Sequence, residues 1–246
     1  MDASSSPDDT FRSIADRCGT DKTLYHGYDR FYPTFIEKFR DTDNACMIEI
    51  GIQKQLSLGL WLEYFPKMFI HGVDIGVEGS GERYCIHKVD QSNEAQLRAL
   101  GEEIKAAKKK CMFINDDGSH VPAHGIISFN YLFKEVLEGG GVYIIEDIET
   151  SYWKRGNIYG YDIRAGYKHR SSLVEIFKRV ADDVNSEYLL EHEKEMQSAL
   201  ASEIPDNVRA MISTITFAQN CIILTKKAAE GHMCDNRPYK WPHLLR

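Results

Sequence analysis

The sequence predicts an α/β fold: a mainly parallel sheet covered by helices on both faces. Short apolar, β-branched runs alternate with longer segments of helical pattern, as in sheets whose strands are joined by helical crossovers. The 246 residues, 43 % of them hydrophobic, suffice for one domain with a large core, and no repeat or long linker divides them. The strand-like runs are residues 46–50, 68–74, 85–89, 111–115 and 142–146.

The segments between and after these runs support the same fold. The clearest helical patterns cover residues 93–108 and 123–137. Pro122 suits the first turn of the second helix, because its missing N–H would have no intrahelical partner there. Near the end, residues 211–217 and 221–225 are two strand-like runs joined by a short turn. They predict an antiparallel β-hairpin at the edge of the parallel sheet.

Five strands alternating with helices, followed by a hairpin, is the element order of the class I methyltransferase fold, a Rossmann-like sheet of seven strands. Other doubly wound folds begin in the same way, so the order alone leaves the function open. This core is expected over residues 46–226. Residues 1–45 then form a helical attachment or lid, and residues 227–246 form a tail.

Composition excludes several classes of function. The formal charge is −7, a poor match to the phosphates of nucleic acid. The chain has no apolar run of membrane-spanning length and starts with the polar residues 1–10, so we expect no membrane anchor and a cytoplasmic protein. The six cysteines are scattered without a C-x-x-C pair, as expected for reduced thiols.

Polar residues at successive strand ends predict a cofactor site, because open parallel sheets bind ligands beyond the carboxyl ends of their strands. Glu49 and Gly51 end the first strand, where a glycine lets the backbone approach a ligand. Asp74 ends the second strand, and a carboxylate there can accept hydrogen bonds from ribose hydroxyls. Asp90 and Gln91 follow the third strand, in position for an adenine or ribose edge. The chain has neither G-x-G-x-x-G nor a P-loop, which argues against NAD and P-loop nucleotides.

A second group of residues predicts a metal site. Asp117 follows the fourth strand, and Glu146 with Asp147 follows the fifth, so the three carboxylates can converge. Oxygen ligands favour Mg²⁺, Mn²⁺ or Ca²⁺ over zinc. Neighbouring residues on a strand face opposite ways, so both acids can share an ion only where the strand ends and turns. His120 is placed to act as a general base, although Asp-Gly-Ser is also a common turn and His120 also fits a surface position.

An aromatic segment follows the fifth strand directly. Such side chains beside a polar site make a platform for sugars or planar rings, although about half of them are expected to serve packing. The segment comprises Tyr152, Trp153, Tyr159, Tyr161 and Tyr167.

Together these motifs resemble those of the metal-dependent sugar O-methyltransferases that use S-adenosylmethionine. The group includes macrolide deoxysugar and rhamnosyl O-methyltransferases and proteins described as cephalosporin hydroxylases. The resemblance covers residues 11–226. Its motifs are Met47-Ile-Glu49-Ile-Gly51, Asp116-Asp117-Gly-Ser-His120, Ile145-Glu146-Asp147 with Thr150-Ser-Tyr152-Trp153, and Cys18-Gly-Thr-Asp-Lys22 followed by His26 and Tyr28.

The resemblance implies a role for each matching position. It makes Asp117, Glu146 and Asp147 the ligands of Mg²⁺ or Mn²⁺, and His120 the base, with Asp117 part of the catalytic centre. On the cofactor it places Glu49 and Gly51 at the methionine end, Asp74 at the ribose, and Asp90 with Gln91 on the nucleoside side. Ser57, in the loop that begins at Gly51, is also expected to bind the cofactor. Tyr152 and Trp153, from the aromatic segment, are the expected contacts of the acceptor, although nothing in that segment identifies it.

The expected function is therefore Mg²⁺-assisted transfer of a methyl group from S-adenosylmethionine to a hydroxyl of a sugar or glycoside. The expected partners are a small-molecule or glycan acceptor and further copies of the chain. Two alternatives stay open: another small-molecule reaction on the same carboxylates, such as methylation of catechol type or at nitrogen or an iron-dependent oxygenation, and a non-catalytic binding protein. The all-oxygen ligand set counts against the oxygenase, because its iron is normally held by two histidines and one carboxylate. The second is considered because residues 51–57 lack the extra glycines usual in the cofactor loop.

Overall fold

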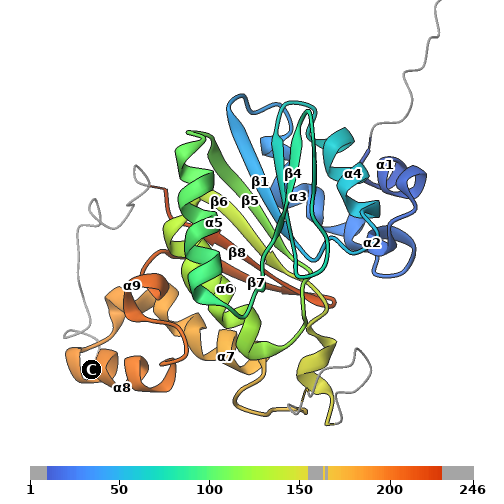
Figure 1. Ribbon diagram of the computed structural model, residues 1–246. Coiled ribbons are helices and arrows are strands. Elements are labelled where there is room, and N and C mark those ends of the chain that lie inside the picture. The colour runs from blue at the N-terminus through green and yellow to red at the C-terminus, as the bar shows by residue number, and fades with distance from the viewer. Residues whose placement is uncertain (1–9, 155–162, 164–165, 229–246) are drawn as a thin grey trace, which may run out of the picture.

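The computed structural model describes residues 10–154, 163 and 166–228 and contains a single eight-stranded sheet (Figure 1). Tyr159, Tyr161 and almost all of the expected tail lie outside the described residues. The strand order is β3-β4-β2-β1-β5-β6-β8-β7. The strands are β1 (Ala45–Ile50), β2 (Phe69–Asp74), β3 (Gly79–Gly81), β4 (Tyr84–Lys88), β5 (Lys110–Asp116), β6 (Leu137–Ile145), β7 (Ile212–Ala218) and β8 (Cys221–Lys226).

This topology confirms the predicted fold. Strands β4, β2, β1, β5 and β6 are parallel, and the hairpin β7–β8 joins them antiparallel through β8. The sheet has one strand more than the seven expected, because β3 pairs antiparallel with β4 at the edge. That strand is the exposed sequence Gly79-Ser80-Gly81, which has no apolar alternation for a sequence pattern to detect.

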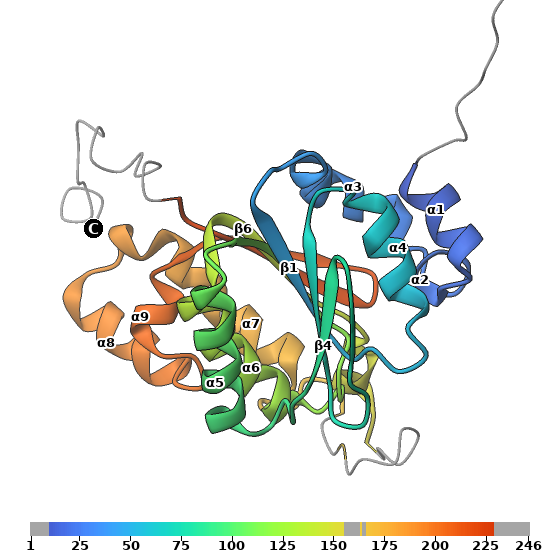
Figure 2. The ribbon, with the colours of Figure 1, turned by 45° about the horizontal axis from the view of Figure 1, so that its top comes forward.

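Helices cover both faces of the sheet (Figures 1 and 2). One core cluster joins the sheet to α5, α6, α7 and α9, and the other joins it to α1, α3 and α4. The helices are α1 (Phe11–Cys18), α2 (Asp21–Leu24), α3 (Tyr32–Ile36), α4 (Leu56–Tyr64), α5 (Glu94–Ala106), α6 (Pro122–Glu135), α7 (Leu173–Val180), α8 (Glu191–Leu200) and α9 (Asp206–Arg209). Short 3₁₀ turns cover Tyr28–Arg30, Glu37–Phe39, Ile148–Tyr152 and Ala181–Tyr188.

The two helices predicted most clearly form where the local sequence sets their starts. Asn93 caps α5, since its side-chain oxygen accepts hydrogen bonds from the backbone N–H groups of Ala95 and Gln96. Helix α6 begins at Pro122. The fixed φ of proline and its missing N–H donor favour this residue in the first turn of a helix.

The segment before β1 packs into the same core as the sheet. The Phe11 ring lies 5.7 Å from the Tyr32 ring and 5.2 Å from the Tyr64 ring, centroid to centroid. These buried aromatic contacts hold α1 and α3 against α4 and bring the intervening residues to the carboxyl ends of the strands. No helix in the described part of the chain is long and apolar enough to cross a membrane.

Candidate active site

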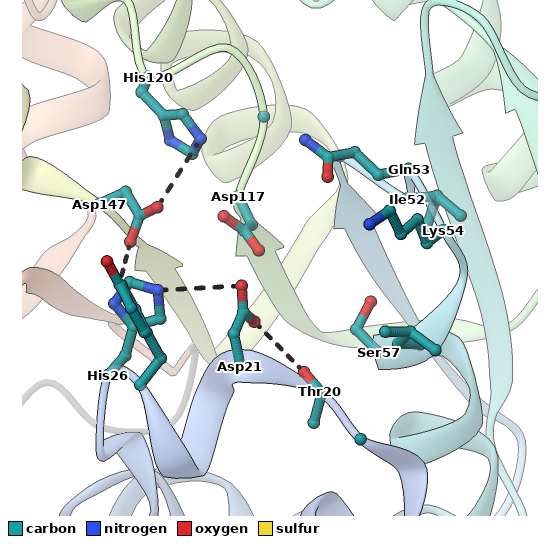
Figure 3. A pocket seen from close by; sticks show the side chains of 15 residues that line it. Thr20, Asp21, His26, Ile52, Gln53, Lys54, Ser57, Asp117, His120 and Asp147 are labelled. Carbon is teal, nitrogen blue, oxygen red and sulfur yellow. Dashed lines mark hydrogen bonds and ion pairs between the residues drawn. The ribbon is translucent and has the colours of Figure 1, made fainter. Parts of the chain in front are cut away.

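A cleft of about 520 Å³ opens where the carboxyl ends of the central strands meet the N-terminal segment (Figure 3). Its walls come from residues 19–26, from the loop after β1, from the loop after β5 and from the end of β6. A second cavity of about 260 Å³ adjoins it and shares Gly51, Gln53 and Gly118 with it. Asp74, Asp90 and Gln91 line this second cavity. The sheet therefore has two adjacent cavities at the edge where the sequence predicts the site.

Gly51 sets the geometry between the two hollows. Its φ is +90°, a conformation that side chains rarely adopt, and a Cβ at this position would overlap the carbonyl oxygen of Asp117. Backbone hydrogen bonds fix both loops, from Gly51 N to Val73 O at 2.8 Å and from Asp117 N to Ile50 O at 2.9 Å. The glycine lets the loop after β5 pack directly on the end of β1.

Asp117, His120 and Asp147 offer a set of ligand atoms for a metal ion, all within 4.8 Å of one another. The Nε2 atom of His120 lies 3.8 Å from Oδ2 of Asp147. Both residues have left-handed backbone, with φ of 56° and 52°, a conformation that costs free energy and often occurs at functional sites. The turn at Asp147 carries its side chain into the cleft (Figure 3).

Glu146, the third carboxylate of the expected set, does not join this group of ligand atoms. Its Oε2 accepts a hydrogen bond from Nζ of Lys22 at 2.8 Å, and its Oε1 accepts one from the hydroxyl of Tyr32 at 2.6 Å. Asp147 alone turns toward the ligand group, because its left-handed backbone ends the strand alternation one residue after Glu146. Burial raises the pKa of Glu146 to about 7, although Lys22 acts in the opposite direction.

Lys22 lies fully buried among three carboxylates. Its Nζ is 2.9 Å from Oδ2 of Asp117, 2.8 Å from Oε2 of Glu146 and 3.6 Å from Oε1 of Glu49. Burial alone lowers the pKa of this ammonium, but the three carboxylates outweigh it and hold the pKa well above its usual value. Lys22 is thus a fixed positive charge behind the cleft wall.

Asp147 is held by residues from both ends of the chain. Its Oδ1 accepts hydrogen bonds from the hydroxyl of Tyr28 and from the side-chain amide of Asn220, each at 3.0 Å. Nδ1 of His26 lies 3.6 Å from the same oxygen. The rings of His26, Tyr28 and Tyr32 stack in series, with centroids 5.1 and 4.9 Å apart.

Sequence reasoning did not identify these supporting residues as parts of the site. Lys22, His26 and Tyr28 entered it only as a lead-in motif, while Tyr32 and Asn220 carried no signal of their own. They lie before the first strand or in the hairpin turn, and only the tertiary packing brings them to the strand ends.

The carboxylate of Asp74, which is expected at the cofactor ribose, accepts hydrogen bonds from backbone N–H groups with both of its oxygens. Its Oδ2 accepts hydrogen bonds from the N–H groups of Ile52 and Gln53, at 3.1 and 2.9 Å. Its Oδ1 accepts from those of Gly76 and Val77, at 2.8 and 3.1 Å. The carboxylate therefore fixes the two loops that flank the smaller cavity.

Asp90 and Gln91 also have contacts within the chain. Hydrogen bonds from the hydroxyl and backbone N–H of Ser92, at 2.7 and 2.8 Å, lower the pKa of Asp90. The Gln91 amide donates to Oδ1 of Asp116 at 2.6 Å and accepts from the N–H of Ser119 at 3.0 Å. Gln91 thus holds the loop that carries Asp117 and His120.

Glu49 and Ser57 connect the first strand to the cleft. The hydroxyl of Ser57, which lines the cleft, donates to Oε2 of Glu49 at 2.8 Å. Oε1 of Glu49 is buried and accepts no hydrogen bond from the described residues. Burial raises the pKa of Glu49, and the Lys22 ammonium opposes this rise.

The expected acceptor contacts lie apart from this arrangement. Tyr152 is 48 % exposed and stacks on Tyr167 at a centroid distance of 6.4 Å. Neither Tyr152 nor Trp153 is among the described residues that line the two cavities.

A mainly parallel sheet with this strand order, a terminal antiparallel hairpin and cavities at its carboxyl edge is the arrangement of the class I methyltransferase fold. Known structures confirm this assignment. The chain is 22 % identical to MycE, a methyltransferase from the mycinamycin biosynthetic pathway whose structure was solved with Mg, SAH and mycinamycin VI. The match covers 90 % of this chain and 56 % of that chain, with a TM-score of 0.70.

Curated sequences give the particular relationship. The chain is 31 % identical over 229 residues to an 8-demethyl-8-α-L-rhamnosyl tetracenomycin-C 2'-O-methyltransferase of Streptomyces olivaceus. It is 31 % identical over 171 residues to an L-olivosyl-oleandolide 3-O-methyltransferase of Streptomyces antibioticus. These matches cover 89 % and 66 % of this chain, and 55 % and 42 % of the relatives, so the chain spans about half the length of the curated proteins it matches.

No protein-family profile matches the chain. The named relatives nevertheless confirm the resemblance seen in the sequence motifs: the chain is similar to sugar O-methyltransferases that are named for tetracenomycin, oleandolide, macrocin and mycinamicin substrates.

Proposed function

We propose that the chain transfers a methyl group from S-adenosylmethionine to a hydroxyl of a sugar or glycoside with the help of Mg²⁺. The observation that carries this proposal is the grouping of Asp117, His120 and Asp147 at the wall of a cleft that adjoins a second cavity. The relatives named above methylate sugar hydroxyls of antibiotic glycosides, which supports the same chemistry here.

The side chains at the cleft fit a hard divalent cation. Asp117 and Asp147 supply carboxylate oxygens, the donors that Mg²⁺ and Mn²⁺ prefer, and the described set contains no thiolate. When bound, such an ion lowers the pKa of an acceptor hydroxyl. Glu146, which the sequence suggests as a further ligand, supports the centre by holding Lys22 in the arrangement described above.

His120 is the proposed general base. Its imidazole lies against Asp147 at the edge of the cleft, within reach of a hydroxyl placed between the two aspartates. A carboxylate beside the ring stabilises the imidazolium that forms when the proton is taken. The attacking oxygen then bonds to the methyl carbon in line while the S–CH₃ bond breaks and the neutral thioether leaves, and the positioning of the two substrates supplies much of the rate.

The two cavities suit the two parts of the cofactor. We assign the nucleoside to the smaller cavity, beside Asp74, Asp90 and Gln91. The methionine part is assigned to the loop of Gly51 and Ser57, with Glu49 behind it. The acceptor then enters from the larger cleft.

Three expectations remain proposals: Tyr152 and Trp153 as acceptor contacts, assembly of identical subunits, and a cytoplasmic location. The acceptor class is a small-molecule glycoside or a glycan end, as for the tetracenomycin and oleandolide glycosides of the relatives.

The first test is calorimetry of S-adenosylmethionine and S-adenosylhomocysteine binding with and without Mg²⁺, followed by a screen for methylated products. The screen includes glycosides, catechols and amines, so that it separates sugar methylation from the alternative acceptors. The matched variants are Asp147→Asn, which removes a proposed ion ligand, and Asp43→Asn, which changes an exposed acid far from the cleft. Binding of neither cofactor form to the unaltered chain would favour a non-catalytic binding protein.

A further inference from the structure

Lys22 is a buried cation that no part of the proposed reaction uses. Its side chain is 0 % exposed and reaches from α2 to the ends of three strands, where Glu49, Asp117 and Glu146 lie. Removing an ammonium from water is unfavourable unless nearby groups compensate for it, and three carboxylates do so here. A neutral side chain there would leave three carboxylates without their cation, so the charge of Lys22 sets the net charge of this buried cluster.

The position of the ammonium relative to the cleft indicates what this charge does. Asp117 lines the cleft, and Nζ of Lys22 lies 2.9 Å behind its carboxylate. A cation bound to Asp117 from the cleft side would therefore share this carboxylate with the ammonium. With the effective dielectric constant of about 20 that suits protein sites, two unit charges about 6–10 Å apart change an affinity by roughly tenfold to a hundredfold.

The proposed reaction changes the charge of the molecule in the cleft. S-adenosylmethionine carries a sulfonium, and methyl transfer breaks its S–CH₃ bond, leaving the electron pair on a neutral thioether. The methyl group forms a bond to the acceptor oxygen, whose proton goes to the base. Substrate and product cofactor thus differ by one positive charge at the sulfur.

We propose that Lys22 is a positioning residue that sets the charge of the methyl-transfer centre and thereby the preference between S-adenosylmethionine and S-adenosylhomocysteine. This inference rests on the proposed function. The ammonium offsets one of the carboxylate charges behind the cleft wall. The affinity for the positively charged sulfonium of S-adenosylmethionine is therefore lower, relative to the affinity for S-adenosylhomocysteine, than it would be without Lys22. The ammonium also holds Glu49 and Asp117 together, linking the cofactor side of the site to the ion side.

The test compares Lys22→Met, which removes the charge but keeps a long side chain, with Lys22→Arg, which keeps the charge. Calorimetry gives the dissociation constants of both cofactor forms for each variant. We expect Lys22→Met to shift the preference toward S-adenosylmethionine at least tenfold, and Lys22→Arg to keep it within threefold of the unaltered chain. If Lys22→Met weakened the binding of both cofactor forms by the same factor, Lys22 would have a structural role only and the proposal would be overturned.

A second variant covers the case in which Lys22→Met does not fold, as judged by circular dichroism. Glu146→Gln keeps Lys22 and removes one of its carboxylates, so the preference should move in the opposite direction, toward S-adenosylhomocysteine. An unchanged preference in a folded Glu146→Gln variant would also refute the proposal.

Mn²⁺ binding separates failure of this inference from failure of the proposed function. If the unaltered chain binds neither cofactor form, the proposed function is lost, but the charge effect is still measurable with Mn²⁺ alone. Lys22→Met should then tighten Mn²⁺ binding at least tenfold, because the repulsion from a nearby ammonium disappears. Unchanged or weaker Mn²⁺ binding in a folded Lys22→Met variant contradicts the assigned role of the charge.

Discussion

Replacing Gly51 with alanine should damage both the stability of the fold and the geometry of the site. The residue has a φ of +90°, and its Cβ would overlap the backbone carbonyl of Asp117, which is not a flexible side chain that can move aside. The left-handed conformation costs an alanine about 1–2 kcal/mol, and relief of an overlap in a packed region costs a further ~1–3 kcal/mol. Gly51→Ala should therefore lower the free energy of unfolding by about 2–5 kcal/mol.

Gly19→Ala is the matched control, because Gly19 has a similar φ of +70° but no atom within 4 Å of its Cβ position. It should lose only the conformational part, about 1–2 kcal/mol. Urea unfolding followed by circular dichroism gives both values. Gly51→Ala should also weaken Mn²⁺ binding about tenfold, since the overlap displaces Asp117. Equal stability of the two variants would show that the close approach of Gly51 and Asp117 does not exist in solution.

Three further predictions follow from the charged groups. Asp147→Asn should weaken Mn²⁺ binding about 100-fold by calorimetry, and a change below threefold would remove Asp147 from the ion site. Burial and the neighbouring Asp147 raise the pKa of Asp117 to about 7. Because protons then compete with the ion for this carboxylate, the affinity for Mn²⁺ should fall about tenfold from pH 8 to pH 6. An affinity that does not change over this pH range would contradict the raised pKa. Arg209→Leu should cost about 3–5 kcal/mol in urea unfolding, because it leaves the buried carboxylate of Asp183, 3.0 Å away, without its cation. Replacing both residues of this pair by leucine should restore most of the loss, and equal losses in the single and double variants would refute that explanation.

The fold could be predicted from the sequence because most of its strands have a distinctive amino-acid composition. Buried parallel strands are continuous apolar runs, and the hairpin signal is a short turn between two β-branched segments. Strand β3 escaped detection because Gly79–Gly81 pairs through its backbone alone. A pattern of hydrophobic side chains carries no information about such a strand.

The site was predictable to the extent that its residues follow strand ends. Asp117, His120 and Asp147 could be grouped from topology, because neighbouring parallel strands end at the same edge. The different directions of the Glu146 and Asp147 side chains could not be predicted from topology. These directions depend on the left-handed backbone of Asp147, a conformation that is uncommon outside glycine. Topology likewise gave no sign that Gln91 would be used to hold the loop after β5.

The residues around the cleft that the sequence did not reveal share one chemical role. The strand ends supply acceptors, and the N-terminal segment supplies the donors that satisfy them: Tyr28 donates to Asp147, Tyr32 to Glu146, and Lys22 to both Glu146 and Asp117. A buried carboxylate that loses its donor is strongly destabilised, so the acidic strand ends can form this cleft only when the segment packs onto them. The residues before β1 therefore form one wall of the cleft and supply the donors for its buried carboxylates.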